Sequence, residues 1–290
     1  RFVRSLGAKM RALLFLSSVL AGAHAFRGRI ARQPRTPLKM AIAVFGASGG
    51  VGSEAVLQAL GRDQDVVAFV RDENRLRVPP GSGGATAGEP LRDDKLTVVS
   101  GSVTSERDVE SAFDAGEISG VVVALGGKTS DVGATMLTDG TRNIIASMKK
   151  RGIKRISVVT SIGAGDSADQ APFFFKVLMM TAMRSIFADK NNQEGLFLNS
   201  GGPGSDLEFC IVRPGGLKDE PATNDVKIIK GEAGGIPRAD VAAFCLDAIM
   251  DPEFEYIGQT PCLSTGEGGT SWTKKDTGGN TARQALNQSA

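Results

Sequence analysis

The stretch "AVFGASGGVG", residues 43–52, places three glycines, Gly46, Gly49 and Gly52, directly after a short apolar run. The run is typical of a buried strand and the residues after it are typical of a helix, so the glycines lie in a strand-to-helix turn. There the first glycine permits the tight turn, the second lets backbone N–H groups approach a pyrophosphate, and the third lets helix and strand pack closely. The anion lies at the positive end of the helix. The stretch therefore predicts a dinucleotide-binding turn.

The rest of the chain alternates between strand-like and helix-like segments. Apolar runs lie at residues 40–45, 65–70, 96–99, 120–125, 155–160 and 208–213. Helical patterns lie at residues 51–60, 105–114, 132–151, 171–198 and 238–250. Apolar strands that alternate with helices are typical of a parallel sheet covered on both faces. We therefore expect an α/β fold, a single doubly wound parallel sheet of the Rossmann type, over residues 40–263, with a flexible, polar tail over 264–290.

Residues 1–39 differ from the rest of the chain in composition, since they carry nine Lys and Arg and no Asp or Glu. The apolar run "ALLFLSSVLAGA" ends in Ala23-His24-Ala25, a small-x-small cleavage pattern, and an arginine-rich segment follows it. This order is typical of a signal peptide followed by a transit peptide. The apolar run is too short to favour a membrane span. We expect a bipartite presequence that delivers the protein to a plastid (chloroplast); simple secretion is the alternative.

The composition also excludes several kinds of function. Subtracting the nine basic residues of the leader from 34 leaves 25 basic and 32 acidic residues, a balance that disfavours nucleic-acid binding. The single histidine, His24, lies in the leader, so the remaining chain has no imidazole for a catalytic triad or a metal site. Cys210, Cys245 and Cys262 have no disulfide-like spacing, and the first two lie in apolar runs that predict burial.

The end of the second predicted strand favours NADP(H) over NAD(H). Arg71 lies 19 residues after Gly52, and Arg75 follows one turn later. At this place an acidic side chain binds the ribose 2′-hydroxyl of NAD, whereas an arginine accommodates the 2′-phosphate of NADP. Asp72 adjoins Arg71, but side chains alternate along a strand, so its carboxylate should point the other way. The alternative is that Arg71 only pairs with Asp72 or Glu73 at the surface.

Four further stretches occur in one order: "VRDENRL" (70–76), "NIIASMKKRGIKRISVVTS" (143–161), "IVRPGGL" (211–217) and "IPRADVA" (236–242). With the glycine-rich turn they resemble the atypical short-chain dehydrogenase/reductase family, whose NAD(P)-binding members include flavin/biliverdin reductase-like, nitrogen-regulator-like and plastid proteins. The resemblance covers residues 41–263. It implies that the cofactor is bound by Gly46, Ser48, Gly49, Gly50, Val51, Gly52, Arg71, Ser102, Val103, Leu125, Gly126, Thr160, Pro214 and Gly215.

Within that resemblance each group of residues has an expected place. The glycine-rich turn would surround the pyrophosphate, Ser102 and Val103 would flank the adenine, and Leu125 and Gly126 would lie along the ribose. Thr160, Ser161, Pro214 and Gly215 would lie near the nicotinamide. The chain departs from the family at Ser102, where an Asp is common, which puts the contact to the adenine amino group in doubt.

A second departure concerns the catalytic residues. The better-known branch of the superfamily reduces carbonyls with Ser and a Tyr-x-x-x-Lys pair. Ser161 and Lys190 occupy the serine and lysine places, but Ile186 stands four residues before Lys190, and the only tyrosine is Tyr256. The predicted catalytic residues are therefore Ser161, to orient the acceptor or the nicotinamide amide, and Lys190, to bind ribose hydroxyls. The alternatives are that Ser161 only caps a turn and that Lys190 is a solvated helix residue.

Hydride transfer to an isolated carbonyl develops an alkoxide that needs a proton donor. Because the tyrosine is missing, we expect an NADPH-dependent reductase of a conjugated small-molecule acceptor, such as a flavin, quinone or bilin, which spreads the incoming charge. The alternative is a non-catalytic NADP(H)-binding regulator or assembly factor in the plastid. A sugar epimerase or dehydratase is disfavoured, because it needs the Tyr-x-x-x-Lys pair. Protein partners stay open.

The run "APFFFKVLMMTAMRSIF" (171–187) is rich in Phe and Met, but Lys176 and Arg184 interrupt it, so it does not predict a membrane span. A helix packed on the sheet is the expected structure. One alternative is an apolar wall beside the nicotinamide, formed by Phe173, Phe174, Phe175, Met179 and Met180. Another is a docking surface for a membrane or a partner.

Overall fold

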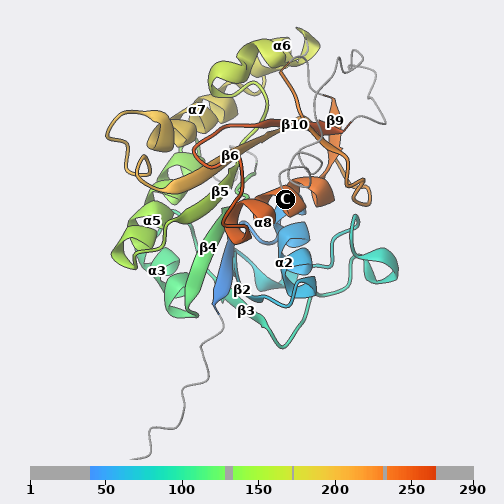
Figure 1. Ribbon diagram of the computed structural model, residues 1–290, viewed down its shortest axis with the longest axis vertical. Helices are drawn as coiled ribbons and strands as arrows, with labels where there is room; N and C mark the ends of the chain where they lie inside the picture. Colours follow the sequence, from blue (N-terminus) through green and yellow to red (C-terminus); the bar gives the residue numbers. More distant parts are fainter. Residues whose placement is uncertain (1–39, 128–132, 172, 231–233, 266–290) are drawn as a thin grey trace, which may run out of the picture. The chain divides into compact units, whose positions relative to one another are not determined.

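The computed structural model describes residues 40–127, 133–171, 173–230 and 234–265. An eight-stranded sheet forms the centre, in the order β3-β2-β1-β4-β5-β6-β10-β8 (Figure 1). Its strands are β1 Ala41–Phe45, β2 Asp65–Val70, β3 Leu96–Ser100, β4 Ile118–Val123, β5 Arg155–Val159, β6 Glu208–Pro214, β8 Val226–Ile228 and β10 Cys262–Thr265. All neighbours pair in parallel except β10 and β8, which are antiparallel. The order 3-2-1-4-5-6 is that of a doubly wound dinucleotide-binding sheet, as predicted.

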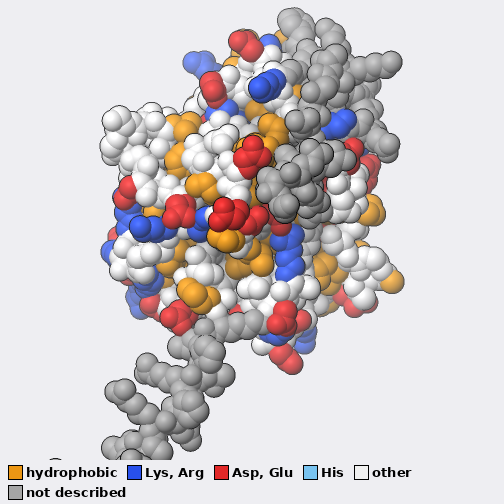
Figure 2. All heavy atoms as spheres, in the orientation of Figure 1, with side chains coloured by type: hydrophobic (Ala, Val, Ile, Leu, Met, Phe, Trp, Pro, Cys, Tyr) orange, Lys and Arg blue, Asp and Glu red, His pale blue; other side chains and the backbone are white. Residues whose placement is uncertain are grey.

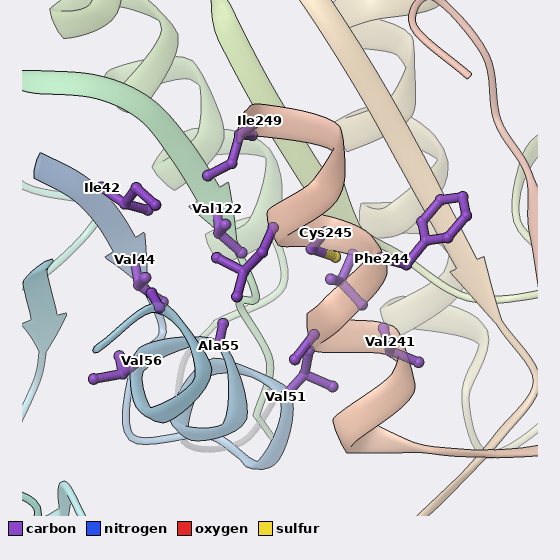
Figure 3. Packing of buried hydrophobic residues seen from close by; sticks show 14 of the residues in the cluster. Ile42, Val44, Val51, Ala55, Val56, Val122, Val241, Phe244, Cys245 and Ile249 are labelled. Carbon is purple, nitrogen blue, oxygen red and sulfur yellow. The ribbon is translucent and has the colours of Figure 1, made fainter. Parts of the chain in front are cut away.

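Helices cover both faces of this sheet (Figure 1). The α-helices are α2 Gly50–Gly61, α3 Glu106–Asp114, α5 Met136–Lys150, α6 Phe173–Met180, α7 Arg184–Leu198 and α8 Arg238–Met250. Strand β1 explains why two layers are needed, because its buried side chains point alternately to the two faces. Ile42 and Val44 join the core under α2 and α8 (Figure 3), whereas Ala43 and Phe45 join the core under α3, α5 and α7.

The predicted helix 171–198 is two helices, a difference that has a local cause. The chain turns between α6 and α7, where the Thr181 hydroxyl donates a hydrogen bond to the carbonyl of Val177 at 2.8 Å. Such a bond from a threonine to the preceding turn competes with the backbone ladder. The N–H of Met183 returns to the carbonyl of Leu178 at 3.0 Å, and α7 then starts at Arg184.

Short strands after β6 are the second difference from the predicted elements. Besides β8 and β10, residues β7 Gly216–Lys218 and β9 Gly235–Pro237 form a separate two-stranded parallel sheet. Strands of three or four residues leave no periodic pattern in a sequence. They add an edge beyond β6 and hold the chain that leads into α8.

The predicted presequence (1–39) and nearly all of the predicted tail lie outside the described residues, while β10 continues to Thr265, past the predicted domain end at 263. Within the described ranges, no helix has both the length and the apolar character needed to cross a membrane. The same residues contain no group of three or more His, Cys, Asp and Glu side chains that could hold a metal ion. Figure 2 shows acidic and basic side chains interspersed on the face that it presents.

Candidate functional site

The glycine-rich turn joins β1 to α2 in the predicted way. Gly46 has a φ of +81°, and an added Cβ there would overlap the carbonyl of Ala124 in the chain after β4. The N–H of Gly49 donates to the carbonyl of Gly46 at 2.9 Å and closes the turn. An added Cβ at Gly52 would overlap the Gly46 carbonyl oxygen, so this glycine lets α2 lie against the end of β1. Helix α2 then begins without a capping side chain and without an acidic residue in its first turn. Its N-terminal amide groups are therefore available to an anion.

A groove of about 570 Å³ runs along the carboxyl ends of the central strands, where open α/β sheets bind their ligands. Twelve of the predicted site residues line it: Gly46, Ser48, Gly49, Gly50, Val51, Arg71, Ser102, Val103, Leu125, Gly126, Thr160 and Lys190. The remaining lining residues are Phe69, Val70, Arg75, Thr104, Ala124, Gly127, Met136, Val159, Leu217 and Arg238.

Four predicted residues do not line the groove. Gly52 is buried behind the turn. Ser161 donates its hydroxyl hydrogen bond to the carbonyl of Ile162 at 3.0 Å, within its own loop. Pro214 accepts from the N–H of Ile162 at 3.0 Å, and Gly215 donates to Leu263 at 3.0 Å, so both are engaged in backbone pairing beside the groove.

One end of the groove is basic. Arg71 follows β2, and Arg75 lies in the short 3-10 helix Glu73–Arg75; both side chains reach the groove. Asp72 caps that helix, because its carboxylate accepts hydrogen bonds from the backbone N–H and the side-chain amide of Asn74 at 3.0 and 3.2 Å. Its carboxylate is therefore engaged by Asn74, and the two arginines give this end its charge.

The segment after β3 is fixed from two sides. The N–H of Ser102 donates to the carboxylate of Asp108 in α3 at 2.9 Å, and the carbonyl of Val103 accepts from Asn143 in α5 at 2.9 Å. The hydroxyls of Ser102 and Thr104 lie 2.8 Å apart. Two hydroxyl oxygens thus stand at the place where the family resemblance implies an Asp, and each can accept a hydrogen bond.

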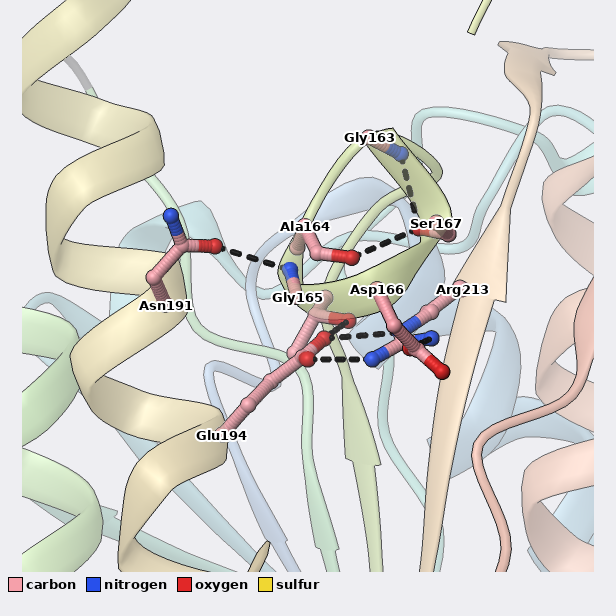
Figure 4. A network of polar contacts seen from close by, with 9 residues as sticks. Gly163, Ala164, Gly165, Asp166, Ser167, Asn191, Glu194 and Arg213 are labelled. Atoms are coloured by element: carbon pink, nitrogen blue, oxygen red, sulfur yellow. Dashed lines mark hydrogen bonds and ion pairs between the residues drawn. The ribbon is translucent and has the colours of Figure 1, made fainter. Parts of the chain in front are cut away.

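A buried polar network forms the other end of the groove. The hydroxyl of Thr160, after β5, donates to Glu194 of α7 at 2.7 Å, and Lys190 donates to the Thr160 carbonyl at 3.0 Å. Arg213 of β6 donates to both carboxylate oxygens of Glu194, at 3.1 and 2.6 Å (Figure 4). Arg213 and Glu194 are each only 2% exposed, so this ion pair is fully desolvated. The network holds Thr160 from both its hydroxyl and its carbonyl.

The charges at this end are shifted by burial and pairing. Burial lowers the pKa of Lys190 to about 8, against the opposing effects of Glu194 and Asp189. Burial also acts to lower the pKa of Arg213, but the hydrogen bonds and charges of Glu194 and Asp166 together outweigh it and raise that pKa. The hydrogen bond from Arg213 lowers the pKa of Asp166. At neutral pH the groove therefore has an ammonium group at Lys190.

Several residues of this region were not predicted to belong to the site. In the sequence, Glu194 is an ordinary residue of a predicted helix, and Arg213 is part of the "IVRPGGL" stretch. The signal that could have identified Arg213 is a charged residue within a predicted buried strand. Asp189 accepts from the N–H groups of Leu137 and Thr138 at 2.8 and 3.0 Å, and so joins α7 to the start of α5 beside Lys190.

The apolar run 171–187 lies apart from the groove where its side chains are described. Met179 and Met180 line a second hollow of about 520 Å³, which they share with Phe187 and Asn191. The Phe175 ring packs edge-on against Phe187, with centroids 5.8 Å apart. The proposed apolar wall beside the nicotinamide also included Phe173 and Phe174, whose side chains lie outside the described ones.

The folded chain does not bring its one tyrosine to the groove. Tyr256 packs against Phe244 and Phe254, with ring centroids 5.8 Å apart in both cases, and does not line the groove.

A family model described as NAD(P)H-binding matches residues 46–252. The chain belongs to this NAD(P)H-binding family. The fold and the family membership together confirm the predicted resemblance to NAD(P)-binding reductases.

Individual relatives agree with this assignment. ChuY of Escherichia coli O157:H7, an anaerobilin reductase, is 27% identical, with a TM-score of 0.60 over 80% of this chain and 100% of that chain. An uncharacterized chloroplastic protein of Arabidopsis thaliana is 27% identical over 225 residues, 73% of each chain. A short-chain dehydrogenase/reductase of Veillonella parvula in complex with NADP shares the fold alone, at 16% identity and a TM-score of 0.61 over 82% of this chain and 99% of that one.

Proposed function

We propose that the protein is an NADPH-dependent reductase of a conjugated acceptor such as a bilin, flavin or quinone. The observation that carries the proposal is the asymmetry of the groove. It has two arginines at one end, a glycine-rich turn with free helix N–H groups in the middle, and Thr160 and Lys190 at the other end. This sequence of groups matches the 2′-phosphate, the pyrophosphate and the ribose-nicotinamide of NADPH. When bound there, NADPH would supply a hydride.

The proposed preference for NADPH over NADH rests on the basic end of the groove. Arg71 and Arg75 offer guanidinium groups suited to a phosphate, and the carboxylate of Asp72, which adjoins Arg71, is engaged by Asn74. A carboxylate that accepts a ribose 2′-hydroxyl is the feature that would favour NADH.

The proposed class of acceptor rests on the end of the groove that contains Thr160 and Lys190. Among the described residues that line the groove, Lys190 is the one group that can lose a proton near neutral pH, because the other charged side chains there are arginines. The chain itself would therefore bind and orient the acceptor, exclude water, and hold Lys190 beside the ribose. A conjugated acceptor places the smallest demand on a proton donor. The anaerobilin reductase activity of ChuY supports an acceptor of the bilin class.

A non-catalytic NADP(H)-binding regulator is the second candidate, and one observation favours it. The Ser161 hydroxyl is turned into its own loop, so the serine expected to orient an acceptor is engaged elsewhere. Such a protein would bind NADPH at the same groove without turnover.

The test uses the full chain purified free of flavin and bilin. NADPH and NADH are titrated by fluorescence, and NADPH oxidation is then followed with a flavin, a quinone and a bilin. Turnover of any acceptor, with tighter binding of NADPH than of NADH and loss of that preference in Arg71→Ala, supports the reductase. Arg107→Ala, at an exposed position outside the groove, is the matched control. Tight NADPH binding without turnover favours the regulator, and failure of both dinucleotides to bind contradicts the proposal.

We further propose that the protein acts in a plastid. The chloroplastic Arabidopsis thaliana relative and the composition of residues 1–39 support this location. Fusion of a fluorescent protein to the carboxyl end of the full chain tests it, because this leaves residues 1–39, the predicted presequence, unchanged. Signal confined to the secretory route would contradict plastid delivery.

A further inference from the structure

The glycine-rich turn has one glycine more than its spacing needs. Gly46, Gly49 and Gly52 account for the tight turn, the approach to the pyrophosphate and the helix–strand packing. Gly50 is the first residue of α2, where an alanine would suit the helix better. An added Cβ at Gly50 would, however, overlap Cδ and Nε of Arg238, the first residue of α8. The absence of a side chain at Gly50 therefore makes room for Arg238.

Arg238 brings a positive charge to the start of α2. Its guanidinium lies over Gly50, and its side chain is 27% exposed and lines the groove. The N-terminus of α2 already has a positive partial charge, with no acidic residue in its first turn to offset it. Two positive groups placed side by side favour an anion between or beside them.

Asp219 orients Arg238 without neutralising the site. Its carboxylate accepts from Nη1 of Arg238 at 2.7 Å, but its side chain is 58% exposed, and Asp219 itself does not line the groove. One N–H group of the planar guanidinium thus has a partner, and its other N–H donors are of the kind suited to phosphate oxygens. Asp219 directly follows Lys218, the last residue of β7, so the small β7–β9 sheet determines where the arginine is held.

We propose that Arg238 is a side-chain clamp on the pyrophosphate of the bound dinucleotide, admitted by Gly50 and oriented by Asp219. The proposal rests on the proposed function, since it places the pyrophosphate at the start of α2. It assigns a role to Gly50, the additional glycine of "GASGGVG", and to the arginine of "IPRADVA". It also makes the pyrophosphate site a joint product of α2 and α8.

A second arginine of the same helix pair provides the control. Arg62, at the carboxyl end of α2, pairs with Asp247 of α8 at 2.7 Å, and its side chain is 28% exposed. It matches Arg238 in charge, exposure and partner type but does not line the groove. If each arginine only formed a structural ion pair, Arg62→Ala and Arg238→Ala should therefore have similar effects on ligand binding.

Three ligands separate the clamp from the rest of the site: NADP⁺, 2′-phospho-ADP-ribose, which keeps the pyrophosphate, and adenosine 2′-monophosphate, which lacks it. In calorimetric titrations of the full chain, Arg238→Ala should raise the dissociation constants of NADP⁺ and 2′-phospho-ADP-ribose by about tenfold to a hundredfold, because a hydrogen bond to a charged group is lost. Binding of adenosine 2′-monophosphate should stay unchanged. Arg238→Lys should fall between, because it keeps the charge and loses the fork. Arg62→Ala should bind all three ligands like the wild type.

Gly50→Ala tests whether the absence of a side chain at Gly50 matters because it makes room for Arg238. It should weaken NADP⁺ binding in the wild-type background and add little in the Arg238→Ala background, because the displaced group is already absent. Equal losses in both backgrounds would overturn the role of Gly50. Unchanged binding of 2′-phospho-ADP-ribose by Arg238→Ala would overturn the clamp alone. Failure of all three ligands to bind the wild type would overturn the clamp and the proposed function together.

Discussion

The two ends of the groove are built by different physical means. The phosphate end extends from Arg71 after β2 to the glycine-rich turn, and the backbone of Gly46–Gly52, one short stretch of the sequence, forms most of it. At the other end, side chains from β5, α7 and β6 hold one another in a buried network around Thr160. The first end depends on backbone shape and the second on buried charge. Substitutions should therefore break them in different ways.

The largest effect should come from Arg213→Met, which removes one partner of the buried pair. Glu194 would then be a desolvated carboxylate without its cation, and such losses lower the free energy of unfolding by about 3–5 kcal/mol. Urea unfolding of the full chain measures this loss. The double variant Arg213→Met/Glu194→Leu should recover much of it, because no unpaired buried charge remains and Asp166, the other partner of Arg213, is exposed to water.

The control for this prediction is Arg62→Met, which breaks the partly exposed pair with Asp247. Its loss should be no more than about 1 kcal/mol. A loss in Arg213→Met as small as that of the control would mean that the network does not support this end of the groove.

The comparison also explains which parts of the molecule the sequence predicts. The central strands, α2 and the glycine turn follow from local patterns, because apolar runs and glycines act on their immediate neighbours. The Arg213–Glu194 pair joins residues from different elements, and no local pattern indicates that a charged side chain in one is matched in the other. Arg238 over Gly50 is a contact of the same kind. The break between α6 and α7 depends on a threonine hydrogen bond that hydrophobic periodicity does not register.

Backbone shape at the phosphate end is tested by Gly52→Ala. The new Cβ would overlap the Gly46 carbonyl and the Ala47 Cα, which are backbone atoms that cannot rotate away. We expect a loss of about 1–3 kcal/mol in unfolding free energy, together with weaker NADPH binding. Gly61→Ala, at the end of the same helix, has open space around the new methyl group and should gain up to about 1 kcal/mol. Equal effects of the two substitutions would show that helix propensity, not the close approach to β1, decides the outcome.

Buried charge at the other end is tested by the pH dependence of stability. Burial lowers the pKa of Lys190 from 10.5 to about 8, so between these values the unfolded chain binds more protons at this residue than the folded chain. The contribution of Lys190 to stability should therefore rise with pH across that window, by at most about 1.4 kcal/mol per pH unit, and stay constant below it.

The measurement is the difference in unfolding free energy between the wild type and Lys190→Met at each pH. Taking the difference removes the opposite effect of Cys210, Cys245 and Cys262, whose pKa values are raised by burial. A difference that is flat from pH 8 to 10 would mean that Lys190 keeps its ordinary pKa and is open to water.

The smallest effect, on the ratio of the NADPH and NADH dissociation constants, is expected from Asp72→Ala. This variant tests whether the Asp72 carboxylate binds a ribose hydroxyl or only accepts hydrogen bonds from Asn74. If the Asp72 carboxylate bound a ribose hydroxyl, its removal would weaken NADH binding and shift the preference further toward NADPH. The carboxylate instead accepts two hydrogen bonds from Asn74, so the ratio of the NADPH and NADH dissociation constants should change by less than about twofold. Because Arg71→Ala should change the same ratio at least about tenfold, the pair of variants shows whether the charge after β2 or the carboxylate next to it selects the cofactor. A larger change in Asp72→Ala than in Arg71→Ala would assign that selection to the carboxylate and reverse the proposed preference.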